Sequence, residues 1–346
     1  MSQQTPATLK QSPTSMNTML MYGPMGSGKT SALAAIARAI YKETGKKTRL
    51  ISGDGGGFDP VGNLIDLGII EPAAIGGRKD ILPTLQDLAR GDWFIDGELV
   101  KPNAKSKATG TVNDLSQVGL YVVEGTKFIG QTMLNNLLGK GINFTDRDLV
   151  TDFTASQEDT GEVHNYGLPV FGHYGFTQNY VTNVIFSFLA LIQSTNSMLI
   201  FTTHEYEDEG DSKQNRKPIT GPASSGKALV GSLPSMFGRV IHMTKLPVKN
   251  IIKSKTGGSE AKFDTEYRAY FRPHRDQFLP TSWEATLRFS PEERKTIAEN
   301  PEWNKLWEQG YVVIGEVDTV GVMRLLNWKK EVKDATNKRL LEELNS

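Results

Sequence analysis

Residues 23–30 read Gly-Pro-Met-Gly-Ser-Gly-Lys-Thr, which matches the pattern G-x-x-x-x-G-K-[ST]. A loop of this kind turns consecutive backbone N–H groups toward one anion, and the start of the following helix adds partial positive charge. Lys29 would reach the β- and γ-phosphates of a nucleotide, and the Thr30 hydroxyl would bind Mg²⁺. We therefore predict a site for ATP and Mg²⁺, with the nucleotide held by Gly23, Pro24, Met25, Gly26, Ser27, Gly28, Lys29, Thr30 and Ser31.

The alternative interpretation of this loop is a glycine-rich turn with an incidental lysine. The flanking patterns argue against it, because an apolar strand pattern at 18–22 precedes the loop and a helical pattern at 31–43 follows it. A second GK stretch at 221–228 has Ala228 where the hydroxyl belongs, and no clear strand precedes it. We expect that stretch to be a loop and not a second nucleotide site.

A carboxylate at the end of a neighbouring buried strand is expected to complete the magnesium site. Glu124 ends the apolar run 121–123 and is our candidate; the alternative is a strand-end glutamate that points into solvent. Hydrolysis also needs a group that orients or deprotonates water. Asp54 is the first candidate and Asp59 the second, although either would also suit an ordinary turn. His204, which follows an apolar strand pattern, is a candidate γ-phosphate sensor or a structural histidine.

Strand and helix patterns alternate over the first two thirds of the chain. We expect strands at 18–22, 48–52, 118–123 and 198–202, and helices at 31–43, 80–90, 126–138 and 178–193. This alternation favours a mostly parallel sheet covered on both faces. Later come short β-like runs at 240–243 and 267–271, a capped helix from 290 and a last helix at about 320–344.

Three segments follow from these patterns. Residues 1–17 are polar and are expected to be a disordered lead. Residues 18–280 form the core, with an insertion at 92–117, and residues 281–346 form a largely helical extension. Four tryptophans of that extension suggest a packed subdomain more than a docking surface: Trp283, Trp303, Trp307 and Trp328.

The composition limits the choice of compartment and partner. Lysine plus arginine equals aspartate plus glutamate, at 39 each, so any nucleic-acid site must be local. Without cysteine the chain has no disulfides, which fits a reducing compartment. The longest apolar run, 181–192, is too short to span a bilayer. We therefore expect a cytoplasmic protein without a membrane partner.

The order of these motifs resembles a RecA-like core. The phosphate loop is followed by SGDGGGFDP (52–60), DILPTLQDLARGD (80–92), YVVEG (121–125) and LIFTTH (199–204). With residues 221–243 and YRAYFRPHR (267–275), the chain resembles phage-encoded RecA-like ATPases, among them single-strand-annealing recombinases related to RecA and Rad51. One extra glycine separates Asp54 from Asp59-Pro60 compared with the RecA-type segment.

That resemblance covers about residues 18–280. It implies an α/β fold, a RecA-like P-loop NTPase core with a mostly parallel central sheet flanked by helices, here with a small helical C-terminal extension. It also implies a homo-oligomer that hydrolyses ATP with Mg²⁺ in the host cytoplasm. RecA-like proteins often complete the site of a neighbouring subunit with basic residues from a late strand. Arg272 and Arg275 match that position, and ordinary surface arginines are the alternative.

Single-stranded DNA is the expected macromolecular partner. Residues 245–275 hold a basic excess, and Tyr267, Tyr270 and Phe271 would offer rings for base stacking. A solvated loop with core aromatics would give the same pattern. Lys213, Arg216 and Lys217 follow the sensor strand, but the acidic run at 205–211 precedes them and weakens a DNA contact there.

The function expected from the sequence is therefore a Mg²⁺-dependent ATPase in DNA recombination or single-strand annealing. One rival is an ATP-driven motor or remodelling enzyme in DNA packaging or replication. A second is a nucleotide-bound assembly protein that hydrolyses little. A small-molecule kinase would need an arginine-rich lid, and the sequence offers no compact segment of that kind.

Overall fold

The computed structural model describes residues 17–53, 57–76, 78, 80–139, 171–208, 219–224, 227–253, 259–272, 286–314 and 320–345. Several residues named above lie outside these ranges. They are Asp54, Lys213, Arg216, Lys217, Arg275, Trp283, and the predicted lead except its last residue.

Within the described chain, one central sheet holds nine strands in the order β13-β11-β10-β1-β7-β6-β2-β3, with β12 paired to β10. The parallel strands are β1 (Thr18–Tyr22), β2 (Lys47–Ser52), β3 (Ile70–Ala74), β6 (Val118–Glu124), β7 (Met198–Thr203) and the first part of β10 (Arg239–Lys253). The antiparallel strands are β11 (Ser259–Tyr270), β12 (Thr286–Leu287) and β13 (Tyr311–Ile314). The predicted fold class, an α/β fold with a mostly parallel sheet, is confirmed.

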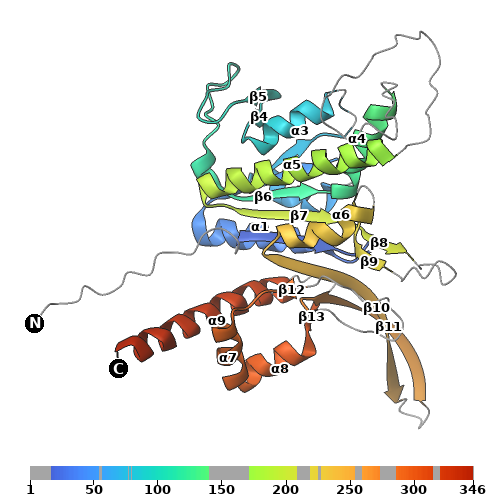
Figure 1. The fold of residues 1–346 in the computed structure, drawn as a ribbon, viewed down its shortest axis with the longest axis vertical. Coiled ribbons are helices and arrows are strands. Elements are labelled where there is room, and N and C mark those ends of the chain that lie inside the picture. Colours follow the sequence, from blue (N-terminus) through green and yellow to red (C-terminus); the bar gives the residue numbers. More distant parts are fainter. Residues whose placement is uncertain are drawn as a thin grey trace, which may run out of the picture.

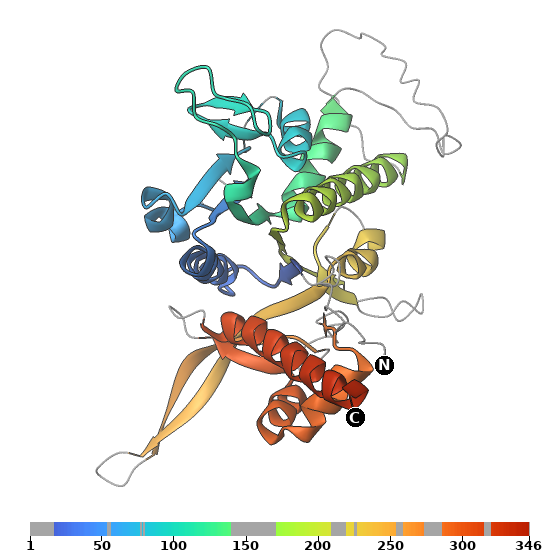
Figure 2. The same cartoon turned by 90° about the vertical axis from the view of Figure 1, so that its left-hand side faces the viewer.

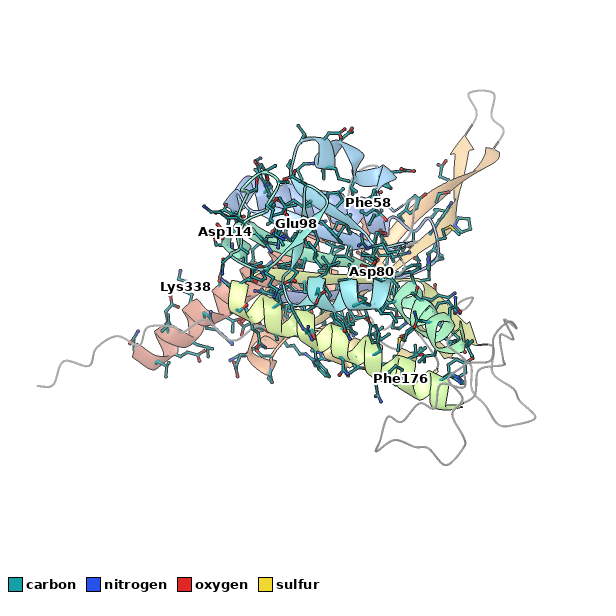
Figure 3. All side chains as sticks on the ribbon, turned by 90° about the horizontal axis from the view of Figure 1, so that it is seen from above. Phe58, Asp80, Glu98, Asp114, Phe176 and Lys338 are labelled. Carbon is teal, nitrogen blue, oxygen red and sulfur yellow. The ribbon has the colours of Figure 1, made fainter. Side chains whose placement is uncertain are left out.

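Helices cover both faces of the sheet (Figure 1). On one face lie α1 (Lys29–Thr44), α2 (Gly62–Asp66), α7 (Pro291–Glu299), α8 (Pro301–Gln309) and α9 (Val320–Asn345). On the other lie α3 (Ile81–Ala89), α4 (Thr126–Gly139), α5 (Phe171–Thr195) and α6 (Lys227–Ser232). Each face of the sheet has its own hydrophobic core, because successive side chains of a strand point to opposite faces. In β1, Met19 and Met21 belong to the core under α1 and α9, and Leu20 and Tyr22 belong to the core under α3 and α5. In Figure 3, Phe176 marks helix α5 and Asp80 the start of α3 on the second face. None of the described helices is long and apolar enough to cross a membrane.

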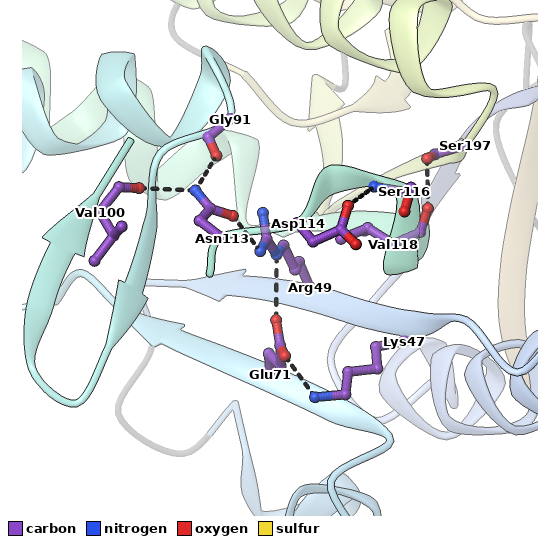
Figure 4. Close-up of polar contacts among 10 residues, drawn as sticks. All are labelled: Lys47, Arg49, Glu71, Gly91, Val100, Asn113, Asp114, Ser116, Val118 and Ser197. Carbon is purple, nitrogen blue, oxygen red and sulfur yellow. Dashed lines mark hydrogen bonds and ion pairs between the residues drawn. The ribbon is translucent and has the colours of Figure 1, made fainter. Parts of the chain in front are cut away.

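The insertion at 92–117 is fixed to the sheet by a buried arginine (Figure 4). Arg49 of β2 is 3% exposed, and its Nη2 donates to Asn113 Oδ1 at 2.6 Å while its Nε donates to Glu71 Oε2 at 3.2 Å. Its guanidinium also lies 4.8 Å from the centroid of the Trp93 ring. The insertion carries the hairpin β4 (Trp93–Ile95) and β5 (Glu98–Val100). Asn113 Nδ2 closes the network by donating to the carbonyl oxygens of Gly91 and Val100, which lie at the two ends of that hairpin segment, so this segment is tied to strand β2.

The structure corrects the sequence predictions after residue 204. The two short β-like runs are parts of β10 and β11, which form a long antiparallel hairpin that extends away from the body of the molecule (Figure 2). The stretch at 221–228 is not a plain loop. It runs from strand β9 (Ile219–Pro222), which pairs with β8 (Glu205–Asp208), into the short helix α6. The C-terminal segment contributes β12 and β13 to the central sheet.

Candidate nucleotide-binding site

The phosphate loop leaves the sheet at the carboxyl end of β1. Tyr22 is fully buried, and Gly23 follows it so close to β10 that a Cβ atom would overlap the carbonyl oxygen of Met243. Gly28 adopts a left-handed conformation (φ 87°) and caps helix α1, whose first hydrogen bond runs from the Ala32 N–H to the Gly28 carbonyl at 2.9 Å. The two glycines therefore set where the loop begins and how it enters the helix.

The remaining loop residues divide into an exposed and a buried group. Pro24, Met25 and Gly26 are exposed, whereas Ser27 is fully buried. Ser31 lies half-buried in the first turn of α1. The exposed residues are accessible to a ligand, as the backbone of a phosphate-binding loop must be.

Lys29 folds back over the loop that precedes it. Its Nζ donates to the carbonyl oxygens of Gly23 and Pro24, both at 2.9 Å, and lies 3.4 Å from Ser27 Oγ. Burial lowers the pKa of Lys29 to about 8, and the carboxylates of Glu124 and Glu205 act in the opposite direction. The ammonium group thus lies at the start of the loop and near two carboxylates, where phosphate oxygens would offer it stronger partners than carbonyls.

Thr30 and Glu124 meet across the sheet. The Thr30 Oγ1 hydroxyl donates to Glu124 Oε1 at 2.9 Å. The sequence predicted that the carboxylate would come from a strand next to β1, but β7 lies between β1 and β6. The contact forms because Thr30 belongs to the first turn of α1 and reaches across the end of β7.

The Thr30–Glu124 pair suits magnesium in its donor chemistry. A hydroxyl and a carboxylate oxygen are hard oxygen donors of the type that Mg²⁺ prefers. Among the described residues, no group of three or more His, Cys, Asp or Glu side chains could hold a metal ion alone. A magnesium ion at Thr30 and Glu124 would take its other ligands from phosphate oxygens and water, as Mg²⁺ commonly does.

The end of β7 is tied to its surroundings by backbone hydrogen bonds. The Thr202 carbonyl accepts from the Gly125 N–H at 3.0 Å, which links β7 to the residue after Glu124. The Thr203 hydroxyl donates to the Ala223 carbonyl, and the His204 carbonyl accepts from the Ala223 N–H at 2.7 Å. His204 itself is exposed. His204, the predicted γ-phosphate sensor, therefore follows the strand next to the phosphate loop and is bonded to Ala223, shortly before α6.

The two candidates for the base lie after β2. Asp54 is outside the described residues, but the chain reaches it from Ser52, which pairs with Glu124 in the register of β2 and β6. Asp59 is exposed and opens a short 3₁₀ helix, with Pro60 as its first-turn proline. The position of Asp59 matches an ordinary turn residue, whereas the chain passes the candidate metal ligand Glu124 two residues before Asp54.

Arg272 is held by its own C-terminal segment. Its Nη1 donates to the Trp307 carbonyl at 2.7 Å, and its guanidinium lies 4.3 Å from the centroid of the Trp307 ring. The structure therefore does not bring Arg272 to Lys29 of the same chain. If Arg272 is to contact a nucleotide bound by a neighbouring subunit, its hydrogen bond to Trp307 of helix α8 must break first.

Sequence analysis missed a contact between Glu205 and His242. Oε1 of Glu205 lies 3.0 Å from Nε2 of His242, and the His242 ring stacks on Tyr22 with centroids 4.6 Å apart. From the sequence, Glu205 is only the first residue of an acidic run at 205–211. The sequence does carry a signal, because His242 interrupts an otherwise apolar strand pattern. In the structure, His242 pairs with Tyr22, the last residue of β1.

Comparisons with known proteins leave the family open. No protein-family model and no curated protein matches the chain. Among solved structures, the RadB recombinase is similar at a TM-score of 0.34 and 14% identity, covering 78% of this chain and 84% of that chain. The case for function rests on the residues of this chain.

Proposed function

We propose that this protein is a Mg²⁺-dependent ATPase of RecA-like type. The observation that carries the proposal is the site formed by Lys29, Thr30 and Glu124. A phosphate-loop lysine lies in its loop, and the adjacent threonine hydroxyl lies 2.9 Å from a strand-end carboxylate. A glycine-rich turn without a ligand has no need for this combination.

Each residue of the site has a defined task in this proposal. The N–H groups of residues 23–30 hold the phosphate oxygens, and Lys29 neutralises negative charge at the β- and γ-phosphates. Thr30 and Glu124 would hold the magnesium ion, and the ion would supply positive charge next to the phosphates. Asp54 is a candidate for orienting the attacking water, and His204 for sensing the γ-phosphate.

The RecA-like assignment is supported by the motif order together with the strand order. Strand β7, which leads to His204, lies between β1, which leads to the loop, and β6, which ends at Glu124. Carboxyl ends of parallel strands meet at one edge of a sheet. A residue directly after β7 is therefore well placed to respond to a ligand held by its two neighbours. We infer that the chain is of the phage-encoded type that its sequence resembles.

Single-stranded DNA is the proposed partner, and the register of the β10–β11 hairpin supports it. Residues that pair across an antiparallel ladder share a face, and the face alternates along the strand. One face holds Lys245 opposite Tyr267, which packs partly against the core, and toward the tip of the hairpin Lys249 opposite Phe263 and Lys253 opposite Ser259. Tyr270 and Phe271, which were also expected to stack on bases, are buried in the core instead. The acidic residues Glu260, Asp264 and Glu266 belong to the other face. Basic and aromatic residues without acids form the combination that binds single strands.

In this proposal the hairpin binds DNA while the nucleotide site controls an oligomer engaged in recombination or strand annealing. The rival is an ATPase that remodels protein or duplex DNA. The test measures ATP hydrolysis with and without single-stranded DNA, with Lys29→Ala as the control. A Lys29-dependent rate that rises with DNA supports the proposal. A Lys29-dependent rate that DNA leaves unchanged would keep the ATPase and remove the DNA role.

A further inference from the structure

A second carboxylate reaches the base of the phosphate loop from the side opposite Glu124. Glu205 directly follows the residue after β7, and His242 belongs to β10. The order β10-β1-β7 places β1 between them. Their 3.0 Å contact must therefore pass over the carboxyl end of β1, where the phosphate loop begins. Glu124, on β6, approaches the loop from the other side of β7.

Packing fixes His242 at this place. The ring is 2% exposed and lies nearly parallel to the ring of Tyr22, at an interplanar angle of 12°. Tyr22 is fully buried and immediately precedes Gly23. The next residue of β10, Met243, lies against Gly23 through its carbonyl group. His242 is therefore a rigid support at the first residue of the loop.

The Lys29 ammonium group lies in the same region. It is bound to the carbonyl groups of Gly23 and Pro24, which are the first two residues of the loop. The Glu205 carboxylate meets His242 over the carboxyl end of β1, and Gly23 follows β1 directly. Because Lys29 would contact the β- and γ-phosphates, Glu205 would lie close to the phosphates of a bound nucleotide.

A half-buried carboxylate beside a triphosphate site needs a reason, because it would repel the ligand. One reason would be a purely structural contact with His242, and a buried polar pair of this kind contributes little to stability once desolvation is counted. The other is chemical. A carboxylate held by a buried histidine close to the phosphates has the position required of a general base, which must lie within one hydrogen bond of the attacking water.

We propose that Glu205 orients and deprotonates the water that attacks ATP, and that His242 is its positioning residue. This inference rests on the proposed ATPase function. The water oxygen forms a bond to the γ-phosphorus while the bond from that phosphorus to the β–γ bridging oxygen breaks. The bridging oxygen leaves with the electron pair as part of ADP. The water proton passes to the Glu205 carboxylate, which then releases it to the phosphate product or to solvent.

The first test compares Glu205→Gln with the wild-type protein in steady-state hydrolysis and in equilibrium binding of a fluorescent ATP analogue. We expect kcat to fall by about 100-fold or more, the range of a lost general base. We expect KM and the analogue Kd to stay the same or to fall, because the substitution removes a negative charge beside the triphosphate and leaves the loop and Lys29 intact. Glu207→Gln, a change in the same short strand β8, is the matched control and should leave kcat unchanged.

The second test separates positioning by His242 from simple packing. His242→Phe keeps an aromatic ring on Tyr22 but has no nitrogen for Glu205, so kcat should fall by about tenfold with KM unchanged. His242→Gln restores an N–H donor and should recover most of the rate. Thermal unfolding of both variants serves as the fold control. If the Phe variant retains the wild-type kcat, His242 has no positioning role.

The outcomes separate this inference from the proposed function. A wild-type protein that shows Lys29-dependent hydrolysis, together with a Glu205→Gln variant within twofold of its kcat, overturns the inference and leaves the ATPase intact. In that case Asp54→Asn becomes the decisive variant for the base. A wild-type protein that neither binds nor hydrolyses ATP overturns both.

Discussion

The Thr30 hydroxyl lies 2.9 Å from the Glu124 carboxylate although a whole strand, β7, separates the strands that lead to these two residues. The contact joins the first turn of α1 to the end of β6. It brings a hydroxyl and a carboxylate, both suited to magnesium, to one point beside the Lys29 ammonium group. The predictions below follow from this arrangement and from the elements that support it.

Lys29 should link ATP binding to proton uptake. Its pKa in the empty site is about 8, lowered from 10.5 by burial, so the folded protein releases this proton at a lower pH than the unfolded chain. Stability of the empty protein should therefore rise as pH increases from about 8 to 10.5. ATP restores the charge, so binding at about pH 8.5 should take up a proton. Calorimetry in buffers of different ionisation heat measures this uptake, which should become small at about pH 6.5, where Lys29 is already protonated in the empty site.

Gly23→Ala should destabilise the protein and remove nucleotide binding. An added Cβ would overlap the Met243 carbonyl oxygen, which belongs to the backbone of β10 and cannot move aside cheaply. We expect a loss of about 2–4 kcal/mol of unfolding free energy, as for other overpacked or strained positions. Denaturant titration measures it. Gly62→Ala, where a Cβ meets no atom within 4 Å, is the control and should cost less than about 0.5 kcal/mol.

Arg49→Met should loosen the insertion at 92–117. The substitution leaves the buried Asn113 Oδ1 atom without its donor, while the partly exposed Glu71 keeps Lys47, so we expect a loss of about 1–3 kcal/mol. The exposed neighbour Lys47 also contacts Glu71, at 2.9 Å, and Lys47→Met should cost about 1 kcal/mol or less. Chemical denaturation and protease cleavage within 92–117 report the effect. Equal losses in both variants would contradict the anchoring role of Arg49.

The hairpin lysines should act as a group in DNA binding. Lys249→Ala combined with Lys253→Ala removes two charges from the basic and aromatic face. We expect weaker binding of single-stranded DNA and a salt dependence that is shallower by about 1–2 in the log–log slope. Lys262→Ala, on the opposite face, is the control and should change the affinity less than the double variant. Fluorescence anisotropy at several salt concentrations provides the measurement.

Local patterns predicted the elements that carry the phosphate loop. Strand β1 has the predicted bounds, and α1, β2, β6 and β7 begin and end within two residues of the predicted positions. Each is a continuous apolar or helical run next to a glycine or polar residue, so its signal lies within a few positions of the chain. The capping box that opens α7 was also predicted, and Ser290 and Glu293 form it.

Other elements carry no such local signal. Strand β3 contains Pro72, which suits only an edge strand, and its place at the edge is a property of the whole sheet. The long β10–β11 hairpin has polar residues on both faces, so the alternation that marks a half-buried strand is absent. The Glu205–His242 contact depends on the order β7-β1-β10, which no window of the sequence specifies.

The most direct measurement of the central claim is the effect of Mg²⁺ on ATP affinity in the wild-type protein and in Thr30→Val and Glu124→Gln. Titration calorimetry with Mg²⁺ and with EDTA gives the two affinities for each protein. If Thr30 and Glu124 hold Mg²⁺, the ion tightens wild-type binding and each variant loses this gain by about tenfold or more, roughly 1.4 kcal/mol, while binding in EDTA is unchanged. Variants that keep the full gain from Mg²⁺ would contradict a magnesium site at Thr30 and Glu124.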